Sequence, residues 1–575
     1  MKKVTSLTPL KGKAFLVALA PMLKLVECVC ELFVPIIVSL IIDNALTETG
    51  PNYGDKGYAL GLVGLVFGLA LVGFMTTMLT QYVASKTSSD YGYDLRKLIF
   101  RKITSLSPSE LDEFGRNKAL NLAGSDALSV QNGVMMFMRL LARAPFLLIG
   151  SIVASFILSP IGGTIVLVAM VFCAISIATV ILLTPKQYGK LQNELDRISI
   201  LGEDALTGRR LIRAFNRQSK QQEEFLEADS KYRKRAILLV KINSLTNPLT
   251  FAFANAGVLF VLYLLGVNGQ ANMPFTVGVG VALINYLTQS LAAFLQFTRL
   301  LTVLSRAYAS KKRIDAFLAK ETNLLEGEKE VTCQEGDIVS FKNVSKGFGG
   351  EKNVLDDISF SVKKGEKIGV FGATGSGKSV LMRLLCREYD PSEGEISIYG
   401  SPISSYKLSS LKKSISYCGA SSGFFRGSIR DNISLGRSFS DEEILLALEK
   451  AQAKGFVLDY EDGLDHEVED KGSNFSGGQK QRLLLARSLL EEADIAIYDD
   501  AMSALDNLTE KRVRDSLLAS KSTTFIVSQK VSSFVSTDKV IVLQDGRIYA
   551  YGTHEELLKT CDFYAKVNDI QRRQM

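Results

Sequence analysis

A glycine-rich segment in the C-terminal half of the chain, GATGSGKS at 372–379, carries the residue types that bind phosphate. It follows a short apolar run at 367–371 and precedes a helical pattern, which is the setting that a P-loop requires. Its glycines let the backbone fold N–H groups around phosphate oxygens, and the helix N-terminus adds positive potential. Lys378 is expected to reach the β- and γ-phosphates, and Ser379 is expected to ligate Mg²⁺. The predicted nucleotide-binding residues of this loop are Gly372, Thr374, Gly375, Ser376, Gly377, Lys378 and Ser379.

Two further segments accompany the loop downstream. ADIAIYDD at 493–500 has the pattern of a buried strand that ends in two acids, and Asp499 suits the coordination sphere of Mg²⁺. An apolar strand that ends in Asp is weak evidence alone. Here it follows NFSGGQKQR at 474–482, and SALD at 503–506 comes next. This order of segments favours an ATP-binding domain.

The order of P-loop, SGGQ, acidic strand and SALD resembles the ATPase domain of ABC transporters. The resemblance implies that ATP and Mg²⁺ are the cofactors, and that Phe348, in VSKGF, stacks on the adenine ring. In that family the signature of one subunit closes over ATP held by the P-loop of the other, so the resemblance also implies a dimer. The signature residues of this chain are Ser476, Gly477, Gly478 and Gln479.

Three positions depart from the family pattern. The residue after Asp499, normally a Glu that polarises the attacking water, is Asp500, and the expected switch histidine is Gln529. The position of the Q-loop glutamine is Ala420. Asp is one methylene shorter than Glu, and misplacing a reacting group by about 1 Å can lower a rate on the order of 10²-fold. We therefore predict that the site binds ATP well and hydrolyses it poorly, with Asp500 and Gln529 at degenerate catalytic positions.

The signature itself is nearly standard, with Phe475 where Leu is usual. An intact signature beside a weakened P-loop site resembles the degenerate-site subunit of bacterial heterodimeric ABC exporters. The resemblance implies a homologous half-transporter as partner, whose competent catalytic site the SGGQ of this chain completes. An inactive homodimer is the alternative that the sequence leaves open.

The elements that must carry these residues divide the 575-residue chain into two domains. Apolar runs of about 20 residues or more, long enough to cross a bilayer, fall between 14 and 305, whereas 325–575 has the pattern of a soluble α/β domain. We predict an α-helical transmembrane domain over 1–320 and an α/β P-loop nucleotide-binding domain over 321–575. The net charge of +7 does not indicate nucleic acid, because the basic residues lie mostly beside apolar spans.

The orientation of the predicted spans follows from the charges between them. The N-terminal tail is basic, and the long segments 86–132 and 186–240 are charged and helix-favouring, so the positive-inside rule places these segments and both termini in the cytoplasm. Six spans with long cytoplasmic extensions resemble a type IV, multidrug-exporter-type ABC transporter in the cell membrane. The predicted spans are 15–42, 58–84, 135–158, 163–183 and two helices within 242–298, an uncharged stretch that turns at 266–274.

Two short segments of the cytoplasmic regions, 107–116 and 202–215, each break a charged helical pattern. The pattern fits either a short cross-helix that docks on a partner surface or a plain turn between two helices. The family resemblance implies coupling helices at these two places.

Charged side chains also occur inside the predicted spans, where they are costly unless paired or solvated. Glu27 and Glu31, with Lys24 nearby, lie at i,i+4 on the first span, and Arg139 and Arg143 do so on the third. One hypothesis is a structural ion ladder between the two helices. The other is that the carboxylates line a wet cavity and attract cationic substrates. Polar residues of the sixth span that fit either cavity lining or helix packing are Asn285, Tyr286, Gln289 and Gln296.

The sequence does not identify the transported compound. Amphipathic small molecules, of the multidrug type, are what the resemblance implies first, and lipid or peptide export are alternatives. A nucleotide-gated channel or regulatory subunit is an alternative of a different class, because an ATP site that does not hydrolyse suits gating. Uptake into inverted vesicles that requires ATP separates transport from gating.

Overall fold

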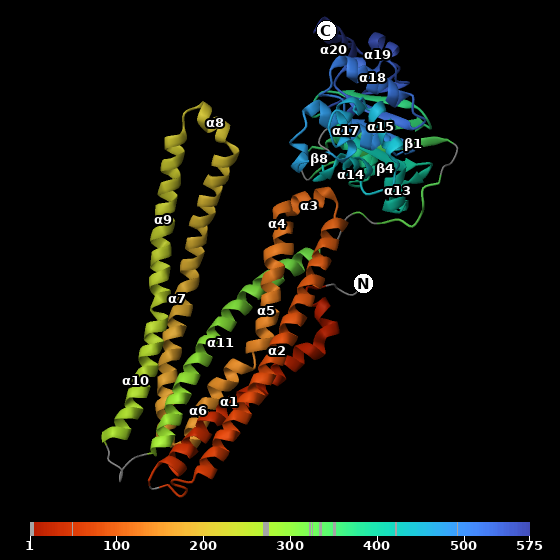
Figure 1. Ribbon diagram of the computed structural model, residues 1–575. Coiled ribbons are helices and arrows are strands. Elements are labelled where there is room, and N and C mark those ends of the chain that lie inside the picture. Colours follow the sequence, from red (N-terminus) through yellow and green to blue (C-terminus); the bar gives the residue numbers. More distant parts are fainter. Residues whose placement is uncertain are drawn as a thin grey trace. The chain divides into compact units, whose positions relative to one another are not determined.

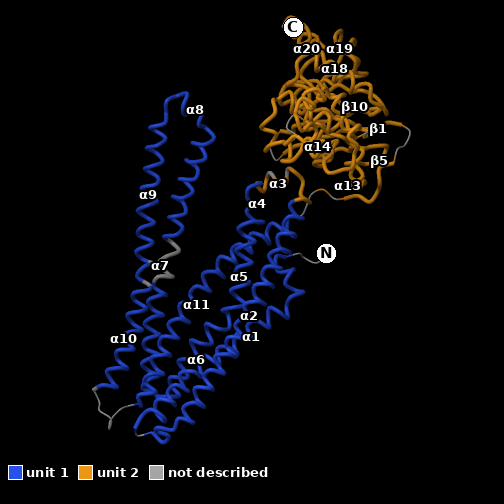
Figure 2. The backbone as a smooth tube through the Cα atoms, in the orientation of Figure 1, with its two compact units in different colours: residues 1–103, 116–320 blue, residues 104–115, 321–575 orange. Residues whose placement is uncertain are grey.

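The computed structural model describes residues 5–48, 50–267, 275–320, 324, 326–332, 336–348, 352–419, 423–491 and 493–574. The chain forms two compact units, which Figure 2 shows in different colours. Unit 1 comprises Met1–Ile103 and Arg116–Lys320, and unit 2 comprises Thr104–Gly115 and Glu321–Met575.

Unit 1 consists of long helices (Figure 1). Within the described residues, six segments are long and apolar enough to cross a membrane, which confirms the prediction of six spans. Several helices run far beyond the apolar spans, because the charged sequence that follows still favours a helix. The elements are η1 (Thr8–Lys13), α1 (Ala14–Leu40), η2 (Ile41–Leu46), α2 (Lys56–Ser105), α4 (Arg116–Asn121), η3 (Leu122–Asp126), α5 (Ala127–Leu140), α6 (Arg143–Leu158), α7 (Pro160–Thr207), α8 (Arg209–Ala214), α9 (Gln218–Ser244), α10 (Thr246–Val267) and α11 (Val277–Leu318).

The last membrane helices pack through an apolar core and are fixed by a few polar contacts. Val166 of α7, Val261 of α10 and Leu287 of α11 are buried in one cluster. The hydroxyl groups of Ser151 and Ser290 lie 2.6 Å apart and join α6 to α11. Small polar residues of this kind hold membrane helices together because the alternative is an unpaired group in hydrocarbon.

The first hairpin of unit 1 is tied to the start of the last span. The Asp43 carboxylate accepts a 2.5 Å hydrogen bond from Thr276 Oγ1 and a 2.8 Å bond from the Gly278 N–H, at the N-terminus of α11. A carboxylate is stabilised at this end of a helix, where backbone N–H groups lack partners. The predicted turn at 266–274 falls mostly on residues 268–274, which lie outside the described residues.

The predicted third span differs from the observed one in a way that matters for its charges. The helix is interrupted between Leu140 and Arg143, so that α5 carries Arg139 and α6 begins with Arg143. The i,i+4 relation expected for these two arginines requires a continuous helix. Leu141 and Ala142 between them keep right-handed helical backbone angles, so the shared helix face stays a prediction.

The two predicted breaks, at 107–116 and 202–215, both contain short helices. α3 (Pro108–Phe114) begins at Ser107, whose hydroxyl accepts a 3.3 Å hydrogen bond from the Glu110 N–H while the Glu110 carboxylate accepts one of 2.8 Å from the Ser107 N–H. This reciprocal pair is a capping box. In the second region α7 ends before Gly208, and α8 follows at the tip of the hairpin that α7 forms with α9 (Figure 1).

Unit 2 contains the α/β domain. Its main sheet has the strand order β12-β11-β3-β10-β9-β6, in which β11, β3, β10, β9 and β6 are parallel. A second sheet has the order β2-β1-β4-β5 and is antiparallel. The strands are β1 (Asp337–Lys346), β2 (Leu355–Lys363), β3 (Lys367–Gly372), β4 (Glu393–Ile398), β5 (Ser401–Pro402), β6 (Ile415–Gly419), β7 (Gly427–Ser428), β8 (Glu467–Val468), β9 (Ile495–Asp499), β10 (Thr523–Ser528), β11 (Lys539–Gln544) and β12 (Arg547–Gly552).

The central strands of the main sheet are buried on both faces, as is usual for parallel sheets covered by helices. Along β9, Ile497 belongs to the core on one face and Tyr498 to the core on the other. The parallel strands end at one edge, and their following loops carry the candidate site. The helices of unit 2 are α3, α12 (Lys378–Leu385), α13 (Leu408–Ser414), α14 (Ile429–Ser434), α15 (Asp441–Lys450), α16 (Lys454–Leu458), α17 (Gly477–Leu489), α18 (Asn507–Leu518), α19 (His554–Thr560) and α20 (Asp562–Gln574).

Candidate nucleotide-binding site

The register of the main sheet brings the predicted site residues to one edge. Gly419 at the end of β6 pairs with Asp499 at the end of β9, and Asp499 pairs with Val527 of β10. Ser528 of β10 in turn pairs with Phe371 of β3, one residue before the glycine-rich loop. The acidic pair, the switch position and the loop therefore meet at the carboxyl edge, where ligands bind in open α/β sheets.

The glycine-rich loop has a backbone that only glycine accommodates well. Gly375 and Gly377 have φ of +85° and +99°, in the left-handed region. A Cβ at Gly377 would lie 2.7 Å from Leu355 Cδ2 and 3.0 Å from the Val354 carbonyl oxygen. Gly372 is equally constrained, because a Cβ there would collide with the Leu543 carbonyl oxygen.

The ammonium group of Lys378 lies over this loop. Its Nζ donates hydrogen bonds of 2.8 Å to the Gly372 carbonyl and 2.9 Å to the Ala373 carbonyl. Burial lowers the pKa of Lys378, and the nearby Asp500 and Asp499 carboxylates oppose that shift. The Ser376 hydroxyl is buried and has no hydrogen-bond partner in the described part of the chain. A buried cation and an unused hydroxyl beside a glycine-rich loop fit a phosphate group.

Ser379 and Asp499, the two predicted metal ligands, lie together. Ser379 Oγ donates a 3.1 Å hydrogen bond to Asp499 Oδ1, and Asp499 is 6% exposed. A hydroxyl and a carboxylate beside a phosphate site are the oxygen donors that Mg²⁺ takes from P-loop proteins. The residues present therefore fit Mg²⁺ bound with a nucleotide.

Asp500 and Gln529, the two predicted degenerate positions, also lie together. The Gln529 side chain hydrogen-bonds the Asp500 carboxyl group, and its Oε1 accepts a 3.4 Å bond from Thr374 Oγ1 in the loop. Asp500 has φ of +51°. Burial and the adjacent Asp499 carboxylate raise the pKa of Asp500, while Lys378 and Gln529 oppose that shift. Ala420, the third predicted departure, lies outside the described residues.

Phe348 follows β1 of the antiparallel sheet, whereas the acidic pair lies at the end of β9 in the main sheet. Its side chain is 51% exposed, and its ring meets Tyr389 edge-on at 5.2 Å between centroids. Lys346 Nζ lies 5.4 Å from the Phe348 ring centroid and 5.5 Å from that of Tyr389. An exposed aromatic ring is what stacking on a base requires.

The signature forms the start of α17. Gln479 N–H donates a 3.3 Å hydrogen bond to Ser476 Oγ, and Ser476 N–H donates a 2.9 Å bond to Gln479 Oε1, which makes a capping box. Gly477 and Gly478 occupy the first turn, so this helix N-terminus can approach an anion closely. Among the described residues, no hydrogen bond or ion pair joins the signature to 372–379.

The sequence did not reveal several residues that link these motifs. Gln481 is buried, donates a 2.9 Å bond to Ser503 Oγ and accepts a 2.7 Å bond from the Ala504 N–H, which ties α17 to SALD. Gln571 of α20 accepts a 2.8 Å bond from the Val531 N–H and donates a 2.9 Å bond to the Gln529 carbonyl. Gln481 lies within the signature segment and could have been singled out, whereas nothing local marks Gln571.

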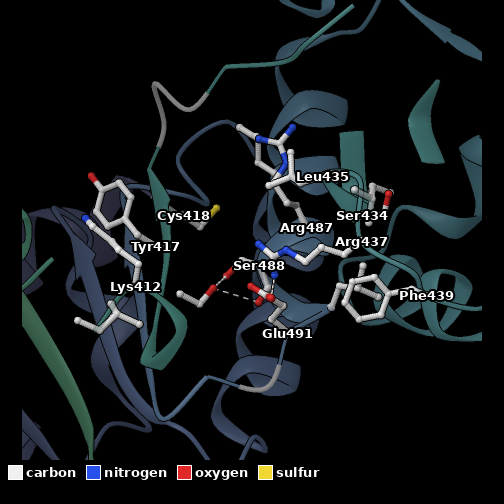
Figure 3. A pocket seen from close by; sticks show the side chains of 15 residues that line it. Lys412, Tyr417, Cys418, Ser434, Leu435, Arg437, Phe439, Arg487, Ser488 and Glu491 are labelled. Atoms are coloured by element: carbon white, nitrogen blue, oxygen red, sulfur yellow. Dashed lines mark hydrogen bonds and ion pairs between the residues drawn. The ribbon is translucent and has the colours of Figure 1, made fainter. Parts of the chain in front are cut away.

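A separate cavity of about 190 Å³ lies beside β6 (Figure 3). Its lining includes none of the glycine-rich loop or signature residues. Its cations are engaged: Arg437 pairs with Glu491, Lys412 donates to the Cys386 carbonyl at 2.6 Å, and Arg487 donates to the Asn432 carbonyl at 2.7 Å. This cavity is therefore not counted as part of the nucleotide site.

The charges within the membrane helices form a network centred on Arg143. It pairs with Glu27 at 3.3 Å and with Glu31 at 2.8 Å, and Glu27 also pairs with Lys24. Lys24 and Glu27 are 2% and 5% exposed, so these charges satisfy one another. Arg139 donates instead to Ser85 Oγ at 2.8 Å, which corrects the expected ladder of two carboxylates and two arginines. Glu31 Oε2, Gln289 Oε1 and Gln296 Oε1 are buried acceptors without a partner in the described chain.

Comparisons with known proteins agree across both domains. A family model described as ABC transporter transmembrane region matches residues 17–294, and one described as ABC transporter matches residues 355–503. The chain is 30% identical over 568 residues to the uncharacterized ABC transporter ATP-binding protein YfiB of Bacillus subtilis, with 98% of each chain covered. It is 28% identical over 524 residues to the ATP-dependent lipid A-core flippase of Xylella fastidiosa, with 90% of this chain and 87% of the relative covered.

The fold is likewise similar to a solved structure. The structure of a bacterial Atm1-family ABC exporter with ATP bound matches with a TM-score of 0.80 and 22% identity, over 98% of each chain. Helical membrane spans, a glycine-rich phosphate site and an SGGQ signature thus occur together on one chain. This protein belongs to the ABC transporter family, as a half-transporter with one transmembrane region and one ATP-binding domain.

Proposed function

We propose that this chain is the degenerate-site subunit of a heterodimeric ABC exporter. In this proposal its own P-loop site retains Mg²⁺–ATP and hydrolyses it slowly, while its signature completes the hydrolytic site of a homologous partner. The observation that carries the proposal is the pair formed by Asp500 and Gln529, which occupies the catalytic positions next to Lys378 and Thr374.

The chemistry of this pair explains slow hydrolysis. Phosphoryl transfer depends on positioning an attacking water and on stabilising charge at the γ-phosphate. The Asp500 carboxylate is one methylene shorter than Glu, and its raised pKa reflects an environment that disfavours the charged form. Gln529 offers a neutral amide where a histidine is expected, and that amide bonds both Asp500 and Thr374. Asp500 and Gln529 therefore hydrogen-bond each other and the loop, and these bonds use the groups that would otherwise orient a water.

Retention of ATP needs groups that this chain keeps. Lys378, Ser379 and Asp499 lie where phosphate and Mg²⁺ require them, and Phe348 is exposed for stacking on adenine. Mg²⁺ would neutralise charge on the phosphates when bound, and Ser379 and Asp499 would hold it. The degenerate site then biases the heterodimer toward the conformation that binds ATP more tightly.

The signature supports a role in the partner's site. Ser476 and Gln479 close a capping box at the start of α17, and Gln481 fixes α17 to SALD. Nothing in this arrangement is degenerate, in contrast to the pair at Asp500 and Gln529. A subunit of this kind loses hydrolysis at its own P-loop and keeps it at the partner's.

Coupling to the membrane domain is assigned to α3 and α8. Residues 104–115, which include α3, group with 321–575 in unit 2. α8 carries Leu211 with a 64% exposed side chain, and Phe215 after it is 69% exposed. Exposed apolar residues at the tip of a charged hairpin suit docking on a partner surface. The proposal places both termini and the ATP-binding domain in the cytoplasm and the spans in the cell membrane.

The cargo is proposed to be an amphipathic small molecule that carries hydrogen-bond donors, such as an amine. Three buried acceptor atoms without partners, on Glu31, Gln289 and Gln296, support that class. A buried acceptor is costly when unpaired, so a donor-bearing ligand gains from meeting it. Lipid is a second candidate, since the relative in Xylella fastidiosa is named a lipid A-core flippase.

Paired substitutions in the native heterodimer test the division of labour. Ser476→Arg in this chain is expected to abolish ATP turnover by the heterodimer, because a bulky cation at the start of α17 blocks the approach of the signature to the partner's ATP. Asp500→Asn in this chain is expected to leave most of that turnover. The opposite pattern, with turnover lost in Asp500→Asn and kept in Ser476→Arg, contradicts the proposal.

A further inference from the structure

Both oxygens of the Asp499 carboxylate are held by hydroxyl groups from neighbouring elements. Ser379 Oγ of α12 donates to Oδ1 at 3.1 Å, and Tyr417 Oη of β6 donates to Oδ2 at 3.0 Å. The first contact is expected for a P-loop protein. The second joins residues 82 positions apart and involves a tyrosine that no motif marks.

The position of Tyr417 follows from the sheet register. Tyr417 pairs with Ile497, two residues before Asp499, and the length of its ring carries the hydroxyl forward to the carboxylate. Gly419, which pairs with Asp499, leaves the space that the ring needs. A Cβ at Gly419 would lie 2.9 Å from both Cε1 and Oη of Tyr417.

Arg383 sets the direction of the hydrogen bond from Tyr417. Its guanidinium hydrogen-bonds the Tyr417 hydroxyl and also that of Tyr389. Guanidinium has only donors, so the Tyr417 oxygen accepts from Arg383 and its own proton points to Asp499. A donor polarised by a cation makes a stronger hydrogen bond to a carboxylate.

We propose that Tyr417 is a positioning residue for Mg²⁺ in the nucleotide site of this chain, because its hydroxyl fixes the Asp499 carboxylate with Oδ1 toward Ser379, the other residue that would hold the metal. The inference rests on the proposed Mg²⁺–ATP site, and it does not depend on the heterodimer. Groups that orient a metal ligand from behind change metal affinity by roughly 10- to 100-fold when removed. Ala420, which follows this strand directly in the sequence at the predicted Q-loop position, has no polar side chain.

Binding of Mn²⁺ to the full chain in lipid nanodiscs, with the non-hydrolysable analogue AMP-PNP, tests the inference. Electron paramagnetic resonance of Mn²⁺ gives both the affinity and a spectrum of the bound ion. Tyr417→Phe is expected to weaken Mn²⁺ binding about tenfold and to alter that spectrum. Binding of AMP-PNP in EDTA, which needs no metal ligand, is expected to stay unchanged in this variant and shows that it is folded.

Two further variants make the test specific. Tyr389→Phe removes the other hydroxyl that bonds Arg383 without touching Asp499, and it is expected to keep the wild-type Mn²⁺ affinity within twofold. Gly419→Ala keeps the Tyr417 hydroxyl but pushes its ring, and it is expected to weaken Mn²⁺ binding as Tyr417→Phe does. Wild-type Mn²⁺ affinity in both Tyr417→Phe and Gly419→Ala overturns the inference and leaves the proposed site standing. A wild-type chain that binds AMP-PNP but takes up no Mn²⁺ beside it overturns both the inference and the proposed Mg²⁺–ATP site.

Discussion

Gln529 donates a hydrogen bond to the carboxyl group of Asp500, so the two residues predicted to stand at the positions of the usual catalytic glutamate and histidine are partners of each other. The bond joins the ends of two adjacent parallel strands, β9 and β10. Thr374 Oγ1 reaches the same amide from the glycine-rich loop at 3.4 Å. Asp500, Gln529 and Thr374 thus form one connected group at the glycine-rich loop.

Lys378→Met is expected to weaken ATP binding by about two orders of magnitude, because the cation that faces the phosphates is lost while the loop keeps its glycines. Folding is expected to be intact. Titration of the full chain with a fluorescent ATP analogue measures the loss.

Lys367→Met is the matched control, since this second buried lysine is bonded to the carbonyls of Ser520 and Ser522 at 2.7 and 2.6 Å, away from the loop. It is expected to lower stability by about 2 kcal/mol, by leaving those carbonyls unpaired, and to spare ATP affinity. Equal ATP affinity in Lys378→Met and the wild type contradicts the assigned role of Lys378.

The variants Glu27→Gln and Glu31→Gln are expected to distinguish a structural role of one carboxylate from a role of the other in transport. Glu27 is 6% exposed in its side chain and pairs with buried Lys24, so its neutralisation leaves a buried charge unpaired and costs about 3 kcal/mol of stability. Glu31 is 36% exposed in its side chain and keeps one oxygen free, so its neutralisation is expected to preserve the fold.

Transport assays then distinguish the roles of Glu31. Uptake of an amine-bearing amphiphile into inside-out vesicles that hold the heterodimer is expected to fall several-fold in Glu31→Gln, while uptake of a neutral analogue persists. A uniform loss of both cargoes, or unfolding of Glu31→Gln in nanodiscs, argues for a purely structural network.

Gln571→Ala is expected to destabilise the segment 528–534 at the end of β10. The Gln571 side chain pairs with the Gln529 carbonyl and the Val531 N–H, and its removal frees both. Hydrogen exchange at 528–534 is expected to accelerate by about tenfold. The reason is that a hydrogen bond contributes roughly 1 kcal/mol, and the segment becomes less ordered when its bonds to Gln571 are lost. Lys566→Ala, on an exposed part of the same helix, serves as control and is expected to leave exchange there unchanged.

The ATP-binding domain is expected to lose stability in mild acid through His554. Burial, and secondly Arg572, lower the pKa of His554 from its usual 6.5, and its Nδ1 lies 2.9 Å from the Tyr564 hydroxyl. The unfolded chain therefore binds a proton at higher pH than the folded chain, so stability falls as pH drops below about 6.5. Thermal unfolding at pH 7.5 and 5.5 measures this, and His554→Gln is expected to reduce the difference. An unchanged difference in His554→Gln assigns the effect to other groups.

Local patterns predicted much of the fold and the site. The glycine-rich loop, the capped start of α17 and the acidic end of β9 each arise from residues close in sequence, so their motifs revealed them. The six spans followed from apolar length, which the bilayer imposes. The short helices α3 and α8 lie in the two segments, 107–116 and 202–215, where the sequence breaks a charged helical pattern.

What could not be predicted depends on contacts between distant segments. The pairing of Arg143 with both glutamates, and of Arg139 with Ser85, depends on how the helices pack, which the apolar pattern does not show. Tyr417 and Gln571 reach their partners through sheet register and helix docking. Neither relation leaves a local signal in the sequence.

ATP turnover by the purified full chain in lipid nanodiscs, without a partner, tests the central claim most directly. The double variant Asp500→Glu with Gln529→His is measured beside it, together with ATP retained after rapid desalting. We predict near-zero turnover with ATP retained by the unmodified chain, and turnover at least about tenfold higher in the double variant. Brisk turnover by the unmodified chain, equal to that of the double variant, would contradict the account and make a catalytic homodimer the correct description.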